Sequence, residues 1–382
     1  MTKEEFYSFF KQKDFCAVNV TIPYKTDAYA LCDVLSDEAR MIGSVNTVVN
    51  KDGVLYGYNT DIFGFIYMLN RAGVAVENKK VLILGTGGTS LTANAACRKL
   101  CAKEIVTVSR SGEINYENVY DAHPDAQVII NTTPVGMYPN NGKSPVDLSR
   151  FEKLSGVADV IYNPGKTRLI LDAQKRNIPT AGGLSMLVAQ AVEADRIFFD
   201  KKDVDLFAVT EKVLSKIEGG VRNVILVGMP GCGKTTVGKI LADKLSREFI
   251  DADDYLTEKE GKSPEKMITE SGQESFRNAE TATLEEITKL SGKVISCGGG
   301  AVLREENREL IRQNSFCVYI MRPTDKLATN GRPLSAGGIE RLCALYEKRH
   351  PLYTECADFA VELNEDGEGC AQKIIERFGL EK

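Results

Sequence analysis

A glycine-rich loop between an apolar run and a helical pattern restricts the fold of this chain more than any other feature. Residues 228–235 read Gly-Met-Pro-Gly-Cys-Gly-Lys-Thr and fit the pattern G-x-x-x-x-G-K-[ST]. The apolar run 223–227 precedes the loop, and a helical pattern over 235–245 follows it. In this context the backbone N–H groups of the loop and the helix N-terminus bind phosphate oxygens. The sequence therefore predicts a nucleotide-binding loop in a parallel α/β domain.

Short β-branched runs alternate with longer helical stretches along the whole chain, which predicts an α/β protein with a doubly wound parallel sheet in each half. The pattern over 184–199 predicts a helix that closes the first half, and Gly219-Gly220 predicts a helix stop and short linker near 215–222. The expected strands lie within 81–85, 104–110, 127–134, 157–162, 223–228, 294–300 and 317–321.

Composition excludes several classes of protein. The formal net charge of −5 does not point to a nucleic-acid or anionic-membrane partner. No apolar run is long enough to cross a bilayer, and the charged first 15 residues do not resemble a secretory signal. The ten cysteines include no Cys-x-x-Cys, and only two histidines occur, so we expect reduced thiols in a cytoplasmic protein without a zinc cluster.

The phosphate loop assigns roles to its own residues. Lys234 is expected to neutralise charge on the β- and γ-phosphates during phosphoryl transfer, and Thr235 is expected to ligate Mg²⁺ beside ATP. The predicted ATP-binding residues of the loop are Gly231, Cys232, Gly233, Lys234, Thr235 and Thr236.

Four further features follow the loop in a fixed order. The first is Phe-Ile-Asp-Ala-Asp (249–253) at a predicted strand end, and the second is Ser-Phe-Arg-Asn-Ala-Glu (275–280) in a helical stretch. The third is the run of glycines 298–300 at the end of another predicted strand. The fourth is a pair of segments downstream, Gly-Arg-Pro-Leu (331–334) and Lys-Arg-His-Pro-Leu-Tyr (348–353). Together they make residues 221–382 resemble shikimate kinase.

The resemblance implies ATP-dependent phosphorylation of shikimate and a role for each matching residue. Asp253 would bind the ring hydroxyls and orient the nucleophile, and Gly299 would place a backbone N–H against the substrate. Arg277 and Arg349 would hold the carboxylate, for which a planar guanidinium is well suited. Asp251 would hold Mg²⁺ through water, and Arg332 would reach the transferring phosphoryl group and ATP from a lid.

Simpler interpretations of these residues stay open. A single arginine is commonly a solvated helix residue, and either Asp251 or Asp253 could cap the next helix. Between residue 325 and Arg332 the chain also lacks the additional arginine that the family uses to stack on adenine, which leaves the adenine contacts open. A small-molecule kinase with a different acceptor is a further alternative, which the Arg277 and Arg349 pair argues against.

The first half contains a second glycine-rich turn. The run 81–84 leads into Gly85-Thr-Gly-Gly-Thr-Ser90 and a helical pattern, which indicates a dinucleotide-binding βα turn or a plain tight turn. The next predicted strand ends in Ser109-Arg110, and a cation at this place suits a 2′-phosphate, so NADP is favoured over NAD. The predicted NADP-binding residues are Gly85, Thr86, Gly87, Gly88, Thr89, Ser109, Arg110 and Gly183.

Six short motifs around this turn make residues 15–200 resemble shikimate dehydrogenase: 19–25, 43–47, 59–64, 131–137, 159–164 and 183–190. The resemblance implies reduction of 3-dehydroshikimate to shikimate by NADPH. Lys25 would donate a proton to the ketone oxygen or hold the developing alkoxide, with Asp61 beside it. The implied shikimate-binding residues are Thr21, Lys25, Asn46, Asp61, Tyr162 and Gln190.

The two resemblances divide the chain into a partial substrate domain (1–76, completed by helices within about 184–218), an NADP-binding Rossmann-type domain (77–183) and a kinase domain (221–382).

The dehydrogenase family opens with a strand and helix that carry a Ser-x-Ser pair for the substrate carboxylate. Here eighteen residues precede Asn19, and Ser8 is the one serine among them, in a helical context. We therefore expect a competent kinase and an impaired dehydrogenase. A kinase whose first half only binds NADP or acts as a scaffold is the alternative, and the oligomeric state stays open.

Overall fold

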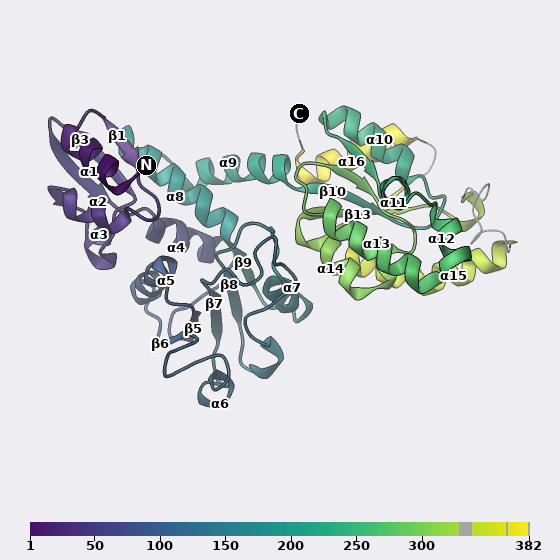
Figure 1. The fold of residues 1–382 in the computed structure, drawn as a ribbon, viewed down its shortest axis with the longest axis horizontal. Helices are drawn as coiled ribbons and strands as arrows, with labels where there is room; N and C mark the ends of the chain where they lie inside the picture. The colour runs from purple at the N-terminus through teal and green to yellow at the C-terminus, as the bar shows by residue number, and fades with distance from the viewer. Residues whose placement is uncertain (328–337, 364–365, 381–382) are drawn as a thin grey trace. The chain divides into compact units, whose positions relative to one another are not determined.

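The computed structural model describes residues 1–327, 338–363 and 366–380 and divides into two compact units (Figure 1). The first contains residues 1–162 and 167–214, and the second contains residues 163–166 and 215–382. Across the described residues, no helix combines the length and apolar character that a membrane span requires.

The first unit contains a five-stranded parallel sheet with the order β6-β5-β7-β8-β9. Its inner strands are runs of buried aliphatic residues, as the sequence predicts for strands covered on both faces. The strands are β5 (Lys80–Leu84), β6 (Glu104–Val108), β7 (Val128–Asn131), β8 (Gly156–Asp159) and β9 (Thr180–Gly182). The helices between and after them are α5 (Gly88–Lys99), α6 (Val119–Ala122), α7 (Arg168–Lys175) and α8 (Gly183–Phe198), with the 3₁₀ turn η1 (Leu148–Arg150).

A second, four-stranded sheet precedes it in the same unit, with the order β1-β3-β4-β2. The β3–β4 hairpin turns at Asp52 and Gly53, which both have positive φ, and β2 pairs with β4 in parallel. The strands are β1 (Ala17–Asn19), β2 (Val34–Leu35), β3 (Thr47–Lys51) and β4 (Val54–Tyr58). The helices are α1 (Lys3–Gln12), which carries Ser8, α2 (Lys25–Leu31), α3 (Asp37–Ile42) and α4 (Asp61–Arg71).

The second unit is a five-stranded parallel sheet with the order β11-β12-β10-β13-β14. Helices α10 and α16 lie on one face of it, and α13, α14 and α15 lie on the other (Figure 1). The strands are β10 (Asn223–Val227), β11 (Phe249–Asp251), β12 (Val294–Ser296), β13 (Ser315–Met321) and β14 (Phe359–Glu362). The helices are α10 (Lys234–Leu245), α11 (Ala252–Glu260), α12 (Pro264–Ser271), α13 (Gln273–Ile287), α14 (Glu305–Gln313), α15 (Gly338–Cys356) and α16 (Gly367–Phe378), with the 3₁₀ turns η2 (Ala301–Leu303) and η3 (Thr324–Lys326).

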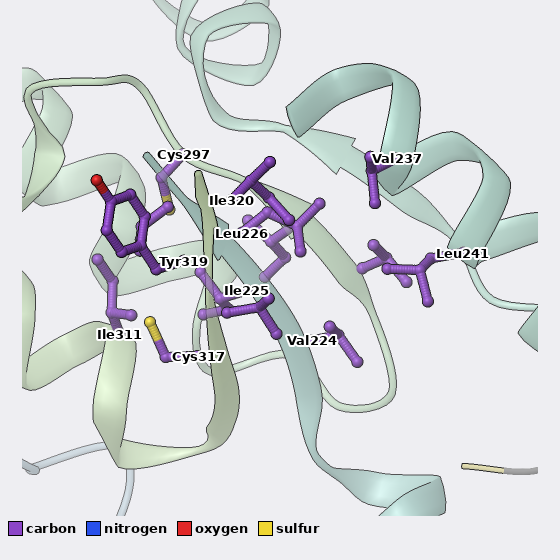
Figure 2. Close-up of a cluster of buried hydrophobic side chains, with 14 of the residues drawn as sticks. Val224, Ile225, Leu226, Val237, Leu241, Cys297, Ile311, Cys317, Tyr319 and Ile320 are labelled. Atoms are coloured by element: carbon purple, nitrogen blue, oxygen red, sulfur yellow. The ribbon is translucent and has the colours of Figure 1, made fainter. Parts of the chain in front are cut away.

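The core of the second unit packs around strands β10 and β13. Figure 2 shows Val237 and Leu241 of α10 against one side of these strands, and Ile311 and Tyr319 on the other side. All four side chains are buried. Burial on both faces fixes the ends of β10, β12 and β13 in space, and the loops that leave those ends carry the functional residues.

The predicted helix stop at Gly219-Gly220 comes too early, because α9 (Leu206–Val221) runs through both glycines and ends at Val221, two residues before β10. The boundary between the two units falls inside this helix, between Leu214 and Ser215. Tertiary donors satisfy the carbonyl groups at its end: Arg247 donates to the carbonyl oxygen of Gly219, and the Gly292 N–H donates to that of Val221 at 2.9 Å. These contacts offset the low helix propensity of glycine, which a local pattern cannot reveal.

Two strand ends also differ from the expectation. β11 ends at Asp251, so Asp253 lies in the first turn of α11 rather than on a strand. Asp251 accepts the Asp253 N–H at 3.1 Å and so caps α11. The sequence had left open whether Asp251 or Asp253 is such a helix cap. β12 ends at Ser296, so the glycines 298–300 form the turn after the strand instead of its end.

Candidate active sites

A cleft of about 400 Å³ in the first unit gathers most of the predicted dehydrogenase residues. Its walls come from the segment after β1, the starts of α2 and α4, the end of β8 and the first turns of α8. Thr89, at the start of α5, also reaches this cleft. The predicted residues that line it are Thr21, Lys25, Asn46, Asp61, Thr89, Tyr162, Gly183 and Gln190.

Lys25 and Asp61 form an ion pair in this cleft. The distance from Lys25 Nζ to Asp61 Oδ2 is 2.7 Å, and the side chains are 27% and 16% exposed. Lys25 begins α2 and Asp61 begins α4, so the start of a helix holds each of them. A carboxylate at a helix N-terminus is favoured by the helix dipole. The pair therefore keeps an ammonium group at the wall of an accessible cleft.

Asn59 and Thr60 belong to this site, although the sequence assigned no role to either. Asn59 Oδ1 accepts the Asp61 N–H at 3.0 Å, and its Nδ2 donates to the Ser44 carbonyl oxygen at 3.1 Å. Thr60 lies between the amides of Asn46 and Gln190. The local signal was the run Asn-Thr-Asp before a helix, which also describes an ordinary capping turn.

Two glycines allow the close packing that forms this cleft. A Cβ on Gly183 would lie 2.0 Å from the carbonyl oxygen of Val160, and one on Gly64 would lie 2.5 Å from that of Met186. Real Cβ atoms do not come so close to a backbone oxygen. Glycine at 183 therefore lets α8 start directly against the end of β8, and glycine at 64 lets α4 pack tightly on α8.

A second cleft of about 650 Å³ in the same unit lies at the ends of β5, β6 and β7. Gly85, Thr86 and Gly87 line one end of it, and Ser109 and Arg110 line another. Gly85 has φ +105°, and a Cβ there would lie 2.9 Å from Thr133 Cγ2, so glycine is required. Gly88 begins α5, whose N-terminus follows the turn.

The residues of this second cleft fit a dinucleotide phosphate. A glycine turn and a helix N-terminus suit the pyrophosphate, and an exposed arginine after the next strand suits a 2′-phosphate. Tyr116 also lines the cleft, and burial raises the pKa of its hydroxyl. This residue was not among the predicted NADP ligands.

The phosphate loop of the second unit lies between β10 and α10, in the strand–loop–helix order that the sequence predicts. Lys234 is 7% exposed, and its Nζ donates to the carbonyl oxygens of Gly228 and Met229, each at 3.0 Å. Gly231 and Gly233 have φ of +79° and +99°. Cys232 is buried and Thr236 is exposed on the first turn of α10. The lysine thus lies against the loop that would surround the phosphates.

Thr235 and Asp251 meet beside the loop. The Thr235 hydroxyl donates to Asp251 Oδ2 at 3.0 Å. A hydroxyl and a carboxylate at hydrogen-bond distance are oxygen donors of the kind that Mg²⁺ binds directly or through water. The residues therefore fit the metal that the sequence assigned to them.

The two predicted carboxylate-binding arginines are both buried, Arg277 at 7% and Arg349 at 4% exposure. Arg277 Nη1 donates to Glu280 Oε2 at 2.6 Å, and Arg349 Nη1 donates to the Gly299 carbonyl oxygen at 3.1 Å. No described residue pairs with Arg349 Nε. Glu280 is a counter-charge for Arg277, whereas the contact given for Arg349 is to a neutral carbonyl oxygen. A buried cation is costly without a counter-charge, so the site with Arg349 suits an anionic ligand.

The turn 298–300 brings Asp253 and Arg277 to the same place. A Cβ on Gly298 would lie 2.8 Å from Asp253 Oδ1, and one on Gly300 would lie 2.3 Å from Arg277 Nη2. Burial raises the pKa of Glu280, and the positive charge of Arg277 opposes that shift. Arg332, the predicted lid residue, lies outside the described residues.

Comparison with known proteins identifies both halves. The family model for the shikimate dehydrogenase substrate binding domain matches residues 2–48, and the model for shikimate kinase matches residues 230–378. A shikimate dehydrogenase (NADP(+)) of Caldicellulosiruptor bescii is 39% identical over 215 residues, which cover 50% of this chain and 72% of that protein.

Solved structures are similar to each half. A chorismate mutase/shikimate 5-dehydrogenase fusion protein of Clostridium acetobutylicum is 35% identical, with a TM-score of 0.51 and coverage of 56% of this chain and 80% of that one. The shikimate kinase of Acinetobacter baumannii, solved with shikimate, is 35% identical, with a TM-score of 0.41 and coverage of 43% and 96%. The chain belongs to the shikimate dehydrogenase family over its first half and carries a shikimate kinase domain after it, which makes it a bifunctional enzyme of the shikimate pathway.

Proposed function

We propose that the first unit reduces 3-dehydroshikimate to shikimate with NADPH, and that the second unit transfers the γ-phosphoryl group of ATP to the 3-hydroxyl of shikimate. The product of the first reaction is then the substrate of the second. The Lys25–Asp61 pair in its cleft supports the first assignment, and the two buried arginines beside the phosphate loop support the second.

In the first reaction, NADPH supplies the hydride when it is bound. The protein's part is to deal with the charge that the ketone oxygen gains. Lys25 Nζ donates a proton to that oxygen or holds it as an alkoxide, and Asp61 keeps the ammonium group in position through the 2.7 Å contact. Thr21, Asn46, Tyr162 and Gln190 line the same cleft and orient the ring.

The second cleft of the first unit would hold NADPH. Gly85, Thr86, Gly87 and Gly88 would face the pyrophosphate, and Ser109 with Arg110 would bind the 2′-phosphate. Thr89 and Gly183 line the substrate cleft, where they would meet the nicotinamide end.

In the second reaction, Asp253 binds the ring hydroxyls and orients the 3-hydroxyl toward ATP. Arg277 and Arg349 hold the carboxylate, and the Gly299 backbone contacts the ring. Lys234 stabilises the negative charge of the β- and γ-phosphates. Thr235 and Asp251 would hold Mg²⁺, which neutralises phosphate charge when bound. The role of Arg332 in the lid stays a prediction.

The experiment for the first reaction compares Lys25→Met with Lys51→Met, which removes an exposed lysine outside the cleft. NADPH oxidation with 3-dehydroshikimate is measured for each variant and for the unmodified chain. We expect Lys25→Met to lower kcat by about 10²- to 10⁴-fold, as for loss of a general acid, and Lys51→Met to leave it unchanged. Binding of NADPH without turnover by the unmodified chain would favour a non-catalytic first unit.

A further inference from the structure

Thr60 connects the two amide side chains of the first cleft. Its side chain is buried, with 1% of the residue exposed, and it directly precedes α4. A threonine in this position commonly accepts a hydrogen bond from an N–H group of its own helix. Thr60 makes no such bond, and Asn59 accepts the Asp61 N–H instead. The Thr60 hydroxyl is therefore turned away from the helix and toward the cleft wall.

The contacts of Asn46 fix the direction of its amide. Its Oδ1 accepts the Thr60 N–H at 2.9 Å and the Thr47 hydroxyl at 3.0 Å. Its Nδ2 consequently faces Asp61 Oδ1 at 3.0 Å and Thr60 Oγ1 at 3.1 Å. Because an amide nitrogen only donates, the Thr60 hydroxyl accepts from Asn46. The hydroxyl proton of Thr60 is then available for another acceptor.

Two acceptors lie within reach of this proton: Gln190 Oε1, and Asn46 Oδ1 at 3.4 Å. Asn46 Oδ1 already accepts the Thr60 N–H and the Thr47 hydroxyl, so we assign the proton to Gln190. Gln190 Oε1 lies 3.3 Å from Thr60 Oγ1 and 3.4 Å from Asn46 Nδ2, so two donors face the same oxygen. Gln190 lines the cleft, and among the described residues its Nε2 has no hydrogen-bond partner. The two protons of Nε2 are therefore left for a ligand.

We propose that Thr60 is a positioning residue that fixes the amide of Gln190 with its NH₂ group toward the substrate. The part of the substrate that meets Gln190 must then be a hydrogen-bond acceptor, such as a carboxylate or carbonyl oxygen or the lone pair of a hydroxyl. The inference rests on the proposed dehydrogenase function. It adds that, in the contact between Gln190 and the substrate, Gln190 is the hydrogen-bond donor. Without Thr60, the Gln190 amide loses one of its two donors and is free to rotate.

The test compares Thr60→Val, which keeps the shape and removes the hydroxyl, with Thr60→Ser, which keeps the hydroxyl. We expect Thr60→Val to raise the KM for 3-dehydroshikimate about 5- to 10-fold, as for loss of one neutral hydrogen bond, with a smaller change in kcat. The KM for NADPH and the kinase turnover of the same sample should not change. An unchanged KM in Thr60→Val, or an equal rise in Thr60→Ser, would overturn the proposal.

A second pair of variants does not depend on how Thr60→Val folds. Gln190→Glu replaces the NH₂ group with an oxygen, and Gln190→Met removes hydrogen bonding at similar length. If the substrate presents an acceptor, the KM of Gln190→Glu should exceed that of Gln190→Met. The reverse order would show that Gln190 presents its oxygen, contrary to the proposal.

The proposed function and this inference can fail separately. If the unmodified chain does not oxidise NADPH, the proposed function fails. The same contrasts are then measured as dissociation constants of 3-dehydroshikimate by calorimetry, in a chain that also carries Arg277→Ala and Arg349→Ala to weaken binding at the kinase site. Weaker binding in Thr60→Val than in Thr60→Ser would still support the positioning role, and equal binding would contradict it.

Discussion

In the proposed reactions, the dehydrogenase cleft of the first unit and the kinase site of the second act on closely related ring acids with different chemistry. In the dehydrogenase cleft, Lys25 is the one basic side chain among the described residues that line it, and it forms an ion pair with Asp61. In the kinase site, two buried guanidinium groups, Arg277 and Arg349, lie beside the glycine turn. In the proposed reactions, the dehydrogenase has its positive charge where negative charge is created, whereas the kinase would use permanent charges to hold the substrate's own carboxylate.

The difference follows from what each reaction demands of the protein. Reduction of a ketone needs a group that can give up a proton, and a lysine can do so, whereas an arginine stays protonated. Phosphoryl transfer needs a fixed nucleophile, and a planar guanidinium holds a carboxylate with defined geometry. We therefore expect substitution of Lys25 in the first cleft to lower kcat, and substitutions of the kinase arginines to raise KM.

The largest effect is expected at the phosphate loop. Lys234→Ala removes the buried ammonium group that faces the loop carbonyls, and we expect kinase kcat to fall by about 10²- to 10³-fold or more, as for loss of one charge-stabilising donor. ADP release with shikimate measures this effect. Dehydrogenase turnover in the same sample is the control for folding. Near-normal kinase turnover in Lys234→Ala would contradict the assignment of this loop as the ATP phosphate-binding site.

A smaller effect is expected at the two arginines. Replacing Arg277 or Arg349 by alanine should raise the KM for shikimate by about 10- to 150-fold, the range for a charge-assisted hydrogen bond of about 1.5–3 kcal/mol. The KM for ATP should change much less. Arg312→Ala is a suitable control, because this arginine lies on α14 away from the turn. Equal effects on both substrates would mean that the arginines act elsewhere.

Cofactor choice in the first unit should depend on Arg110. Because this arginine is exposed, we expect a modest effect: Arg110→Asp should narrow the preference for NADPH over NADH by about 10-fold or reverse it. Dissociation constants of both cofactors, measured by fluorescence titration, would show the change. Tighter binding of NADH than NADPH by the unmodified chain would refute the assignment of the second cleft.

The smallest expected effect concerns stability and pH. Glu280 titrates near 4.5 in the unfolded chain, and burial raises its pKa in the folded state. Its contribution to stability is therefore fully present below pH 4.5 and is lost as the pH rises through the folded pKa. Arg277→Ala removes the charge that opposes the shift, so this loss should extend to higher pH. Its slope cannot exceed about 1.4 kcal/mol per pH unit for one proton.

Urea unfolding of Arg277→Ala, followed between pH 4.5 and 8, would measure this slope for the second unit. Adding Glu280→Gln removes the titrating group and should flatten the curve. If the double variant keeps the same pH dependence as Arg277→Ala, another group is responsible.

The predicted parts of the fold are those with a local signature. The inner strands of both parallel sheets could be predicted, since strands such as β5 and β10 are continuous runs of buried aliphatic residues. The edge strands β9 and β14 were not predicted, because they have three or four residues with mixed exposure. The four-stranded sheet of the first unit was not predicted, because its strands have two to five residues and mixed exposure. Their pairing comes from tertiary contacts, as does the continuation of α9 through Gly219.

In the candidate sites too, residues with a local sequence signature could be predicted, and residues placed by tertiary contacts could not. Lys25, Asp61, Lys234 and the two arginines could be named because each belongs to a motif with a chemical meaning. Thr60 could not, since its role depends on Gln190, which is 130 residues away in the sequence. Tyr116 likewise reaches its cleft only through the folding of the turn after β6.

The central claim is that one chain catalyses two consecutive reactions, reduction of 3-dehydroshikimate and phosphorylation of the shikimate that results. The most direct measurement supplies the unmodified chain with 3-dehydroshikimate, ATP and Mg²⁺, with and without NADPH, and follows phosphorylated shikimate by mass spectrometry. The account predicts that shikimate 3-phosphate forms with NADPH and does not form without it, because the first unit must make the substrate of the second. Formation of the product without NADPH, or failure to form it from 3-dehydroshikimate when added shikimate is phosphorylated, would contradict the claim.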